Sequence, residues 1–316
     1  MKDSFGREIT YLRLSVTDLC NLRCRYCMPK EGVCLRRHEE MLTEEEMTDA
    51  VTVAAELGIR KVRITGGEPL VKKNILSICK NISHVPGIEE VCLTTNGTLL
   101  SNMAADLKAA GIQRINISID TLNEEKYSEI TRGGRLKDAL CGIEAALNAG
   151  FEKVKLNTVL IGGFNDDEIK ALAELTREKD LDVRFIELMP MLSDSGFGED
   201  AFIPVGTVKE KLPEVIFLGR DGVAELMKLP GAKGNIGLIS PISCRFCASC
   251  NRLRLTADGK IKPCLHSPLE YDIKGLKREQ MKDKMKQAIL AKPESYGKLS
   301  YADRSCAGRT MDRIGG

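Results

Sequence analysis

Short runs rich in β-branched residues alternate with helix-like stretches along the first part of the chain, and this alternation limits its fold most strongly. The runs are Tyr11–Val16, Lys61–Thr65, Glu90–Thr95, Arg114–Ile119, Val154–Val159 and Val183–Leu188. Strands that alternate with helices form a parallel sheet with right-handed crossovers. Six such units are too few for a complete eight-fold barrel, so the sequence predicts an α/β fold built on an open, partial (βα)6 barrel of the TIM type.

The stretches between these runs carry helix start and stop signals. Thr43 is followed three residues later by Glu46, which is the pattern of a capping box. Gly58, Gly111 and Gly150 stand where helix-like segments end, and glycine is the residue that most often ends a helix. These signals support the assignment of alternating strands and helices.

Polar and apolar residues alternate within each predicted strand, which is unusual for parallel strands that are buried on both faces. In the first strand Tyr11, Arg13 and Ser15 share one face. The corresponding face of the later strands carries Lys61, Arg63, Thr65, Cys92, Thr94, Asn96, Arg114, Asn116, Ser118, Asp120, Lys155, Asn157, Glu187 and Met189. Because an unpaired buried polar group costs about 1–3 kcal/mol, this face predicts a barrel lumen filled by water or ligand. The alternative is an antiparallel sheet with this face in solvent, which the helical crossovers disfavour.

The chain has 316 residues and a formal net charge of +2. Its length exceeds what one hydrophobic core usually supports, so we expect one large domain with a smaller module. The balanced charge gives no global field that favours nucleic acid or an anionic membrane as a partner, so any bound anion needs a local basic cluster. Residues 1–16 contain no apolar run, so they resemble neither a signal peptide nor a spanning helix, and we expect a cytoplasmic location.

A glycine-rich, weakly periodic stretch from Asp194 to Lys233 marks the expected start of a second unit. The sequence therefore predicts a barrel unit over 1–193 and a C-terminal module over 194–316. Within this module we expect strands at Ile236–Ile239 and Arg252–Thr256 and a helix from about Leu276 to Leu290.

The pattern of cysteines indicates metal ligation rather than disulfides. The chain has 12 cysteines and only three histidines, and large charged chains without an export signal usually keep their thiols reduced. Cys20, Cys24 and Cys27 form Cys-x3-Cys-x2-Cys after the first predicted strand. Three thiolates leave one iron of a four-iron cluster open, and S-adenosylmethionine can chelate that iron through its amino and carboxylate groups. Zinc is the alternative, but the sequence offers no fourth ligand nearby.

A second triad, Cys247, Cys250 and Cys264, is spaced Cys-x2-Cys-x13-Cys and is also one ligand short of a four-iron cluster, which suggests substrate at the open iron. A zinc ribbon is an alternative for this triad. A protein that only carries electrons is disfavoured, because it gains nothing from an iron that lacks a protein ligand. Cys244, three residues before Cys247, is expected to be a bystander. The thiols expected in the core or on the surface are Cys34, Cys79, Cys92, Cys141 and Cys306.

The spacing of the first triad, with Tyr26 before its third cysteine, resembles the radical S-adenosylmethionine superfamily. Gly66-Gly67-Glu68-Pro69 is similar to the segment that contacts the methionine amino group in that superfamily. The second triad, with the intervening NRLRLTADGKIKPCL, resembles the GTP 3′,8-cyclase family, the molybdenum cofactor biosynthesis protein A family. This resemblance runs from DSFGR near the start to the terminal Ile314-Gly315-Gly316.

The resemblance implies two [4Fe-4S] clusters, S-adenosylmethionine as cofactor, and a radical that removes the ribose 3′ hydrogen of GTP before the carbon radical attacks guanine C8. One cluster is then bound by Cys20, Cys24 and Cys27, and the other by Cys247, Cys250 and Cys264. The residues implied for S-adenosylmethionine are Tyr26, Gly67, Ser118 and Met189. Those implied for GTP are Arg13, Arg63, Thr94, Lys155, Arg252 and Arg254; their alternative role is ion pairing with Asp120 or Glu187.

The resemblance also assigns the C-terminal tail a role in the active site, with Arg309, Gly315 and Gly316 as catalytic candidates. A frayed terminus is the alternative for this tail. The implied partners are a reductant such as flavodoxin or ferredoxin and a downstream cyclic pyranopterin synthase, with neither nucleic acid nor membrane involved; the oligomeric state, with a homodimer as one arrangement, stays open. The competing function is another radical S-adenosylmethionine enzyme with an auxiliary cluster, such as a peptide or haem maturase.

Overall fold

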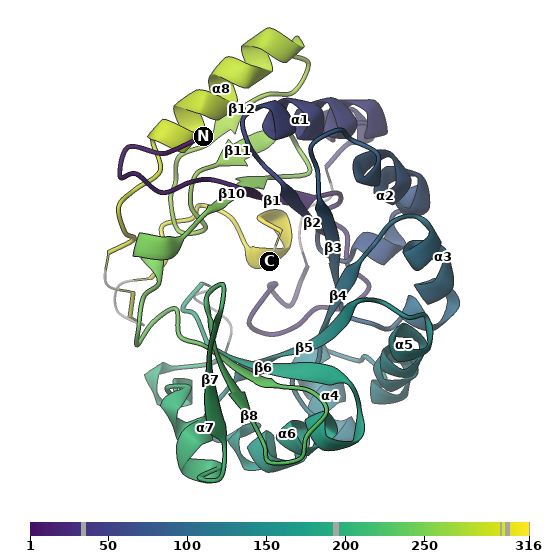
Figure 1. The fold of residues 1–316 in the computed structure, drawn as a ribbon, viewed down its shortest axis with the longest axis vertical. Coiled ribbons are helices and arrows are strands. Elements are labelled where there is room, and N and C mark those ends of the chain that lie inside the picture. Colours follow the sequence, from purple (N-terminus) through teal and green to yellow (C-terminus); the bar gives the residue numbers. More distant parts are fainter. Residues whose placement is uncertain (33–35, 192–195, 298, 301–303, 316) are drawn as a thin grey trace.

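The computed structural model describes residues 1–32, 36–191, 196–297, 299–300 and 304–315. A single 12-stranded sheet curves around the centre of the molecule, and the helices lie outside it (Figure 1). The strands are β1 (Tyr11–Ser15), β2 (Lys61–Thr65), β3 (Glu90–Thr95), β4 (Arg114–Ser118), β5 (Lys153–Leu160), β6 (Leu181–Glu187), β7 (Ile216–Asp221), β8 (Ala224–Lys228), β9 (Ile236–Ile239), β10 (Arg252–Leu255), β11 (Lys260–Lys262) and β12 (Tyr271–Asp272).

The α-helices largely occupy the stretches between strands. They are α1 (Glu44–Glu56), α2 (Ile75–Ser83), α3 (Ala104–Ala109), α4 (Glu124–Thr131), α5 (Leu136–Asn148), α6 (Ile169–Glu178), α7 (Gly206–Lys211) and α8 (Arg278–Leu290). The predicted capping box of α1 is confirmed, because Thr43 Oγ1 accepts from the Glu46 amide and the Glu46 carboxylate accepts from the Thr43 amide. Gly58 and Gly111 have φ of +100° and +94°, the left-handed conformation that ends a helix without a Cβ penalty.

The strands β1 to β6 pair in sequence order and run parallel, which confirms the predicted partial (βα)6 barrel. Their outward side chains form the core with the helices: Leu12, Leu14, Ile64 and Leu93 are fully buried. The inward side chains are mostly polar. The register is well defined because a shift by one residue would exchange these two sets.

Strands from the C-terminal part extend both edges of this sheet. β9 pairs parallel with β6 at one edge, and β10 pairs parallel with β1 at the other. Beyond them lie antiparallel additions, β8 with β7 on one side and β11 with β12 on the other. The chain between β9 and β10, residues 240–251, therefore spans the opening between the two edges. The predicted strands β9 and β10 and helix α8 are confirmed. The glycine-rich stretch 194–233, for which no element was predicted, contains α7, β7 and β8.

The division into units 1–193 and 194–316 stays a prediction, since the sheet continues across it through the pairing of β6 with β9. In the described part of the chain, the helices are all too short or too polar to cross a bilayer.

Candidate active site

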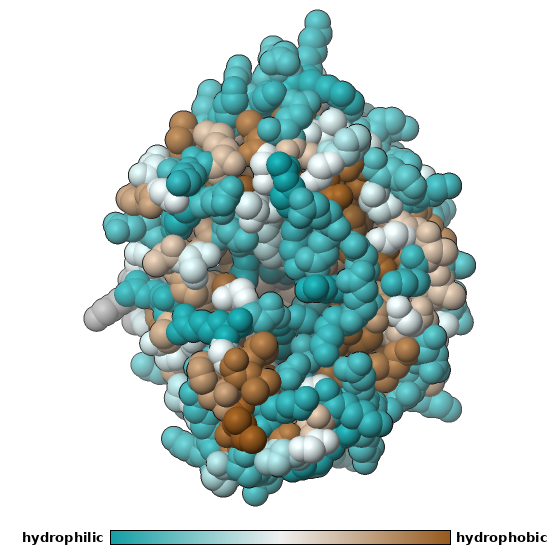
Figure 2. Space-filling view, in the orientation of Figure 1, coloured by the Kyte–Doolittle hydropathy of each residue, from teal (hydrophilic) through white to brown (hydrophobic). Residues whose placement is uncertain are grey.

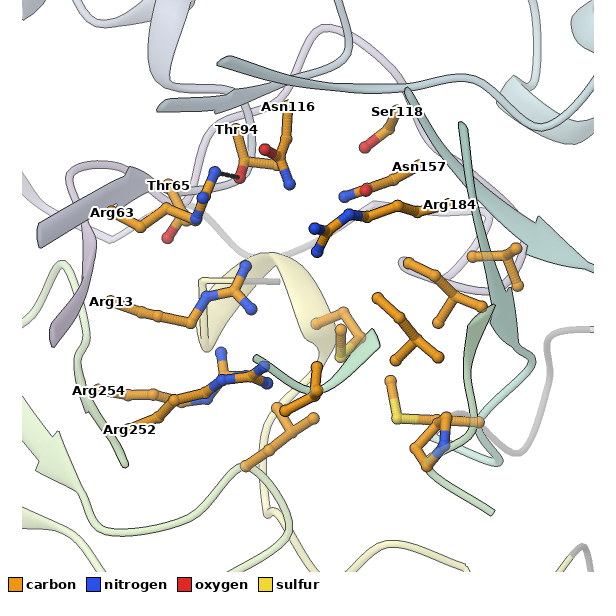
Figure 3. A pocket seen from close by; sticks show the side chains of 18 of the residues that line it. Arg13, Arg63, Thr65, Thr94, Asn116, Ser118, Asn157, Arg184, Arg252 and Arg254 are labelled. Atoms are coloured by element: carbon orange, nitrogen blue, oxygen red, sulfur yellow. Dashed lines mark hydrogen bonds between the residues drawn. The ribbon is translucent and has the colours of Figure 1, made fainter. Parts of the chain in front are cut away.

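The inward side chains of the barrel enclose a cavity of about 520 Å³, called the lumen below. Basic residues stand side by side across it, because Arg13 of β1 lies in register with Arg63 of β2 and with Arg254 of β10. Arg252 lies in register with Tyr11 in the next row. Figure 3 shows Arg13, Arg252 and Arg254 pointing into the lumen from one side and Arg184 from the opposite side.

These guanidinium groups are crowded and poorly hydrated. Burial lowers the pKa of Arg13 well below its usual value, and the neighbouring Arg254 lowers it further. Burial, followed by the charge of Arg252, lowers the pKa of Arg254 to about 10. Arg63 donates from Nε to the Tyr11 hydroxyl at 2.5 Å and from Nη1 to Thr94 Oγ1 at 3.4 Å. A row of buried cations of this kind is suited to an anion with several charges.

The far wall of the lumen contains Lys155 of β5 and Arg184 of β6, both paired with Asp221 at the end of β7. The expected alternative pairs with Asp120 and Glu187 are replaced by other contacts. Asp120 accepts from the Tyr26 hydroxyl at 2.7 Å and from the Val159 amide at 2.9 Å.

One prediction about the inward face of β6 was wrong. Arg184 and Ile186 line the lumen, whereas Glu187 points away and accepts from the amides of Ile242 and Ser243 at 2.8 and 2.9 Å. The buried carboxylate attaches the end of β6 to the turn after β9, a role that strand alternation alone does not reveal. Met189 lines the lumen as predicted.

The loop after β1 brings the first cysteine triad to the lumen, which Cys20, Cys24 and Cys27 all line. The Cys27 amide donates to the Cys24 carbonyl at 3.0 Å, and Arg132 Nη1 donates to the Met28 carbonyl at 2.8 Å. Burial raises the pKa of Cys20 to about 11 and raises the pKa values of the other two thiols as well. After burial, Asp120 and then Cys20 raise the pKa of Cys24 further, and Cys24 is the next largest cause for Cys27. Thiolates crowded in this way need a strongly cationic centre to stabilise them.

The predicted Gly66-Gly67 segment packs directly on this loop. The Gly67 amide donates to the Thr17 carbonyl and the Glu68 amide to the Leu19 carbonyl, both at 2.8 Å. A Cβ on Gly67 would lie 2.4 Å from the Leu19 oxygen, so a side chain there would displace the cysteine loop. Tyr26, Gly67, Ser118 and Met189, predicted to contact S-adenosylmethionine, all line the lumen.

The second triad lies in the segment between β9 and β10 and at the end of β11. Cys250 and Cys264 line the lumen, and Cys247 is near enough for both thiols to raise its pKa after the larger effect of burial. Burial raises the pKa of Cys250, but Lys292 and Arg252 outweigh it, so that its pKa is lowered overall. Cys244 is exposed, and its role as a bystander stays a prediction.

The donors at both triads are soft thiols, the ligands that iron–sulfur clusters use. Among the described residues, no three Cys, His, Asp or Glu side chains are grouped closely enough to hold one metal ion. The thiols of each triad fit three ligands of a four-iron cluster, and a zinc ribbon stays the alternative at the second triad.

The tail enters the lumen region at Gly315. Its carbonyl accepts from Arg254 Nη1 at 2.6 Å. Gly315 has φ of +76°, and a Cβ there would lie 2.4 Å from Thr65 Oγ1 and 3.2 Å from Ser15 Cβ. Ile314 is fully buried, so the described tail is not a frayed end. Gly316 lies outside the described residues.

Arg309 lies apart from the lumen, in a second cavity that also contains Pro29 and Arg36. Its guanidinium pairs with Asp258 at 2.9 Å and with Glu270 at 2.5 Å. A catalytic role for Arg309 stays a prediction; its contacts favour a role in positioning the tail.

Sequence reasoning missed several residues that line the lumen. Lys61 and Arg114 were placed on its face but given no role, although both are basic. Arg184 was missed because the inward face of its strand was assigned to Glu187 and Met189, which alternate with it. Asp221 and His266 gave no usable signal, because only tertiary structure brings them to the lumen.

Comparison with known proteins agrees with this geometry. Residues 14–176 match the Radical SAM superfamily model, and residues 181–298 match the model Molybdenum Cofactor Synthesis C. The GTP 3′,8-cyclase of Alkaliphilus metalliredigens is 50% identical, with all of both chains covered. That of Moorella thermoacetica is 46% identical with the same coverage.

Two solved structures show the same fold at low identity. Streptococcus suis SuiB aligns with a TM-score of 0.61 at 15% identity, covering 82% of this chain and 61% of that one. Methylornithine synthase (PylB) aligns with a TM-score of 0.52 at 15% identity, covering 66% and 63%. From the matched models and the full-length relatives, the chain belongs to the radical S-adenosylmethionine superfamily and, within it, to the GTP 3′,8-cyclase family.

Proposed function

We propose that the lumen is where this enzyme cyclises GTP to (8S)-3′,8-cyclo-7,8-dihydroguanosine 5′-triphosphate, the first step of molybdenum cofactor biosynthesis. The observation that carries the proposal is the convergence of three elements on one cavity: thiols of both cysteine triads, the row of basic residues, and the tail. A peptide or haem maturase stays the competing function, and the row of cations suits the several charges of a triphosphate.

Each triad would hold a [4Fe-4S] cluster with one iron left without a protein ligand. The first cluster, when bound, supplies the electron that cleaves S-adenosylmethionine. The backbone of Gly67, which contacts the cysteine loop, and Tyr26, fixed by Asp120, would orient the methionine end of that cofactor. Ser118 and Met189 would contact its remainder, since both line the lumen.

The triphosphate of GTP would lie among the guanidinium and ammonium groups of the lumen. The predicted contacts Arg13, Arg63, Lys155, Arg252 and Arg254 reach this cavity from β1, β2, β5 and β10, and Thr94 lines it as well. Arg184 adds a further cation on the wall formed by β6. Forked guanidiniums in a partly dry site bind phosphate more tightly than exposed ones do.

The tail would hold the substrate in its reactive pose. Gly315 is anchored to Arg254, one of the proposed phosphate contacts, so tail and nucleotide meet at the same side chain. We further propose a small reductant protein such as flavodoxin or ferredoxin and a cyclic pyranopterin synthase downstream. A cytoplasmic location and a homodimer complete the proposal.

The proposal is tested by comparing GTP with guanosine. Replacing Arg252 or Arg254 by Ala should weaken GTP binding to the anaerobically reconstituted enzyme by roughly thirtyfold, or about 2 kcal/mol, while guanosine binding changes little. Titration calorimetry gives both values. Equal losses for the two ligands would show that these arginines do not contact phosphate, and a wild type that binds neither would reject the proposed function.

A further inference from the structure

The β7–β8 hairpin brings an acidic side chain to a wall of the lumen that is otherwise basic. Asp221 ends β7 and pairs with Ala224 at the start of β8, so that Gly222 and Val223 form a two-residue turn. Gly222 has φ of +60°, as such tight hairpins require. Asp221, Gly222 and Val223 all line the lumen, so the tip of the hairpin points into it.

The carboxylate of Asp221 bridges two cations of different strands. Oδ2 lies 2.7 Å from Lys155 Nζ and also pairs with Arg184 Nη2. The two basic side chains are 8% and 10% exposed, whereas Asp221 is 44% exposed. The cations are therefore fixed inside the barrel, while the anion reaches them from the solvent side and can return to water at little desolvation cost.

Asp221 differs from the other acids of the described lumen lining, Glu68 and Asp312. Glu68 accepts hydrogen bonds from the Thr95 hydroxyl and the Asn96 amide, and Asp312 lies beside Cys27. Burial tends to raise the pKa of Asp221, but Lys155 and then Arg184 outweigh it and lower this pKa to about 2. The carboxylate is thus ionised at any physiological pH.

The surroundings of the hairpin differ sharply between its base and its tip. Ile216 and Phe217 of β7 are 55% and 61% exposed, and Figure 2 shows an apolar patch in the region of β7 while hydrophilic residues border the central hollow. Glu225, next to the turn, pairs with Lys209 on the outer surface instead of with a lumen residue. Asp221 is therefore the one carboxylate of this hairpin that contacts Lys155 and Arg184, the side chains proposed to bind phosphate.

We infer that Asp221 is a specificity-determining residue, whose carboxylate competes with a phosphate group of the nucleotide for Lys155 and Arg184. The inference rests on the proposed function, since it needs a nucleotide in the lumen. A triphosphate offers enough negative charge to displace the carboxylate, and a monophosphate offers less. Because the cyclised product retains the triphosphate, the same carboxylate recovers its cations when product leaves and so favours release.

The test compares wild type, Asp221→Asn and Glu225→Gln as anaerobically reconstituted holoenzymes. Titration calorimetry with GTP, GDP, GMP and guanosine gives four dissociation constants for each. We expect Asp221→Asn to bind GTP roughly fivefold more tightly, with a smaller gain for GMP and no change for guanosine. The control removes a carboxylate from the same hairpin outside the lumen and should leave all four constants unchanged. Asp221→Ser provides a second variant should the asparagine fold poorly.

A turnover measurement adds an independent readout. With Asp221→Asn, KM for GTP should fall and inhibition by added triphosphate product should strengthen by a similar factor, since substrate and product bind through the same groups. Unchanged or weaker GTP binding by both Asp221 variants, with wild type still binding GTP, would overturn this inference alone. A gain that is equal for GTP and guanosine would also overturn it, because guanosine has no phosphate to compete with.

Discussion

Gly315 shows how little space a single residue of the tail has. The gap between Ser15 and Thr65 admits a residue with no Cβ, and the positive φ at this position adds a backbone reason for glycine. The carbonyl of the same residue is held by Arg254. Position and conformation are therefore both constrained where the tail meets the proposed nucleotide site.

We predict that Gly315→Ala lowers formation of the cyclised nucleotide by on the order of a hundredfold, since a shift of about 1 Å at a reacting site costs that much. Both clusters and cleavage of S-adenosylmethionine should remain. Iron content, deoxyadenosine yield and product yield are measured together by chemical assay and chromatography. Gly206→Ala is the control, because a Cβ at Gly206 meets nothing within 4 Å. Normal product yield from Gly315→Ala would reject the role of the tail.

Cys244 differs from its neighbours in exposure, and this difference predicts a difference in function. Cys244→Ala should keep the full iron content and activity. Cys250→Ala should lose about half of the iron, since one of two four-iron clusters is lost, and should still cleave some S-adenosylmethionine without forming cyclised product. If Cys244→Ala also lost half of the iron, Cys244 would be a ligand and the second cluster would have no open iron.

At the scale of elements, strand alternation predicted most of the barrel and much of its lining. On β1–β5 most of the predicted inward residues line the lumen, among them Arg13, Arg63 and Asn157. On β6 the alternation predicted the wrong face for Glu187, which is buried because it accepts a hydrogen bond from the amide of Ile242 after β9. The adjacency of β10 to β1 could not be predicted, since pairing across more than 200 residues leaves no local pattern. Asp221 was missed for the same reason.

The N-terminal segment is an element whose function becomes visible only in three dimensions. Arg7 donates to the carbonyls of Cys247 and Glu294 at 2.9 Å and to that of Pro293 at 2.7 Å. Asp3 orients its guanidinium through Nε at 2.6 Å. The DSFGR motif therefore fastens the start of the chain to Cys247 of the second triad and to the segment that follows α8.

We predict that Arg7→Ala loosens the backbone at Cys247, because its carbonyl and those of two residues after α8 lose their shared donor. The variant should lose iron of the second cluster, up to about half of the total, while cleavage of S-adenosylmethionine persists. Iron analysis after gel filtration measures this loss. Arg37→Ala is a suitable control, since Arg37 is 76% exposed and pairs only with neighbouring glutamates among the described residues. Full retention of iron by Arg7→Ala would contradict the proposed positioning role.

At the scale of the whole molecule, the C-terminal part completes the barrel sheet at both edges. Without β9 and β10, the edges of β6 and β1 would expose unpaired backbone groups that promote aggregation. The C-terminal part therefore covers both edges of the barrel sheet and also carries the second cysteine triad.

We accordingly predict that a chain ending at residue 193 forms aggregates on gel filtration and lacks a cooperative thermal transition. A chain that lacks only residues 304–316 keeps the entire sheet and should remain monodisperse and unfold cooperatively. A stable, cooperatively folded fragment 1–193 that binds S-adenosylmethionine would show that the two predicted units are independent.

The register between β10 and β1 provides a way to separate correctly folded molecules from misfolded ones. A slip of one residue would turn Leu253 and Leu255 toward the lumen and remove Arg252 and Arg254 from it. Such a molecule would keep its helices and most of its core, and spectroscopy of secondary structure would not distinguish it. Its affinity for polyanions would nevertheless fall, so retention on an immobilised triphosphate column would separate correctly registered molecules from misfolded ones, and the ligand itself would favour correct closure during refolding.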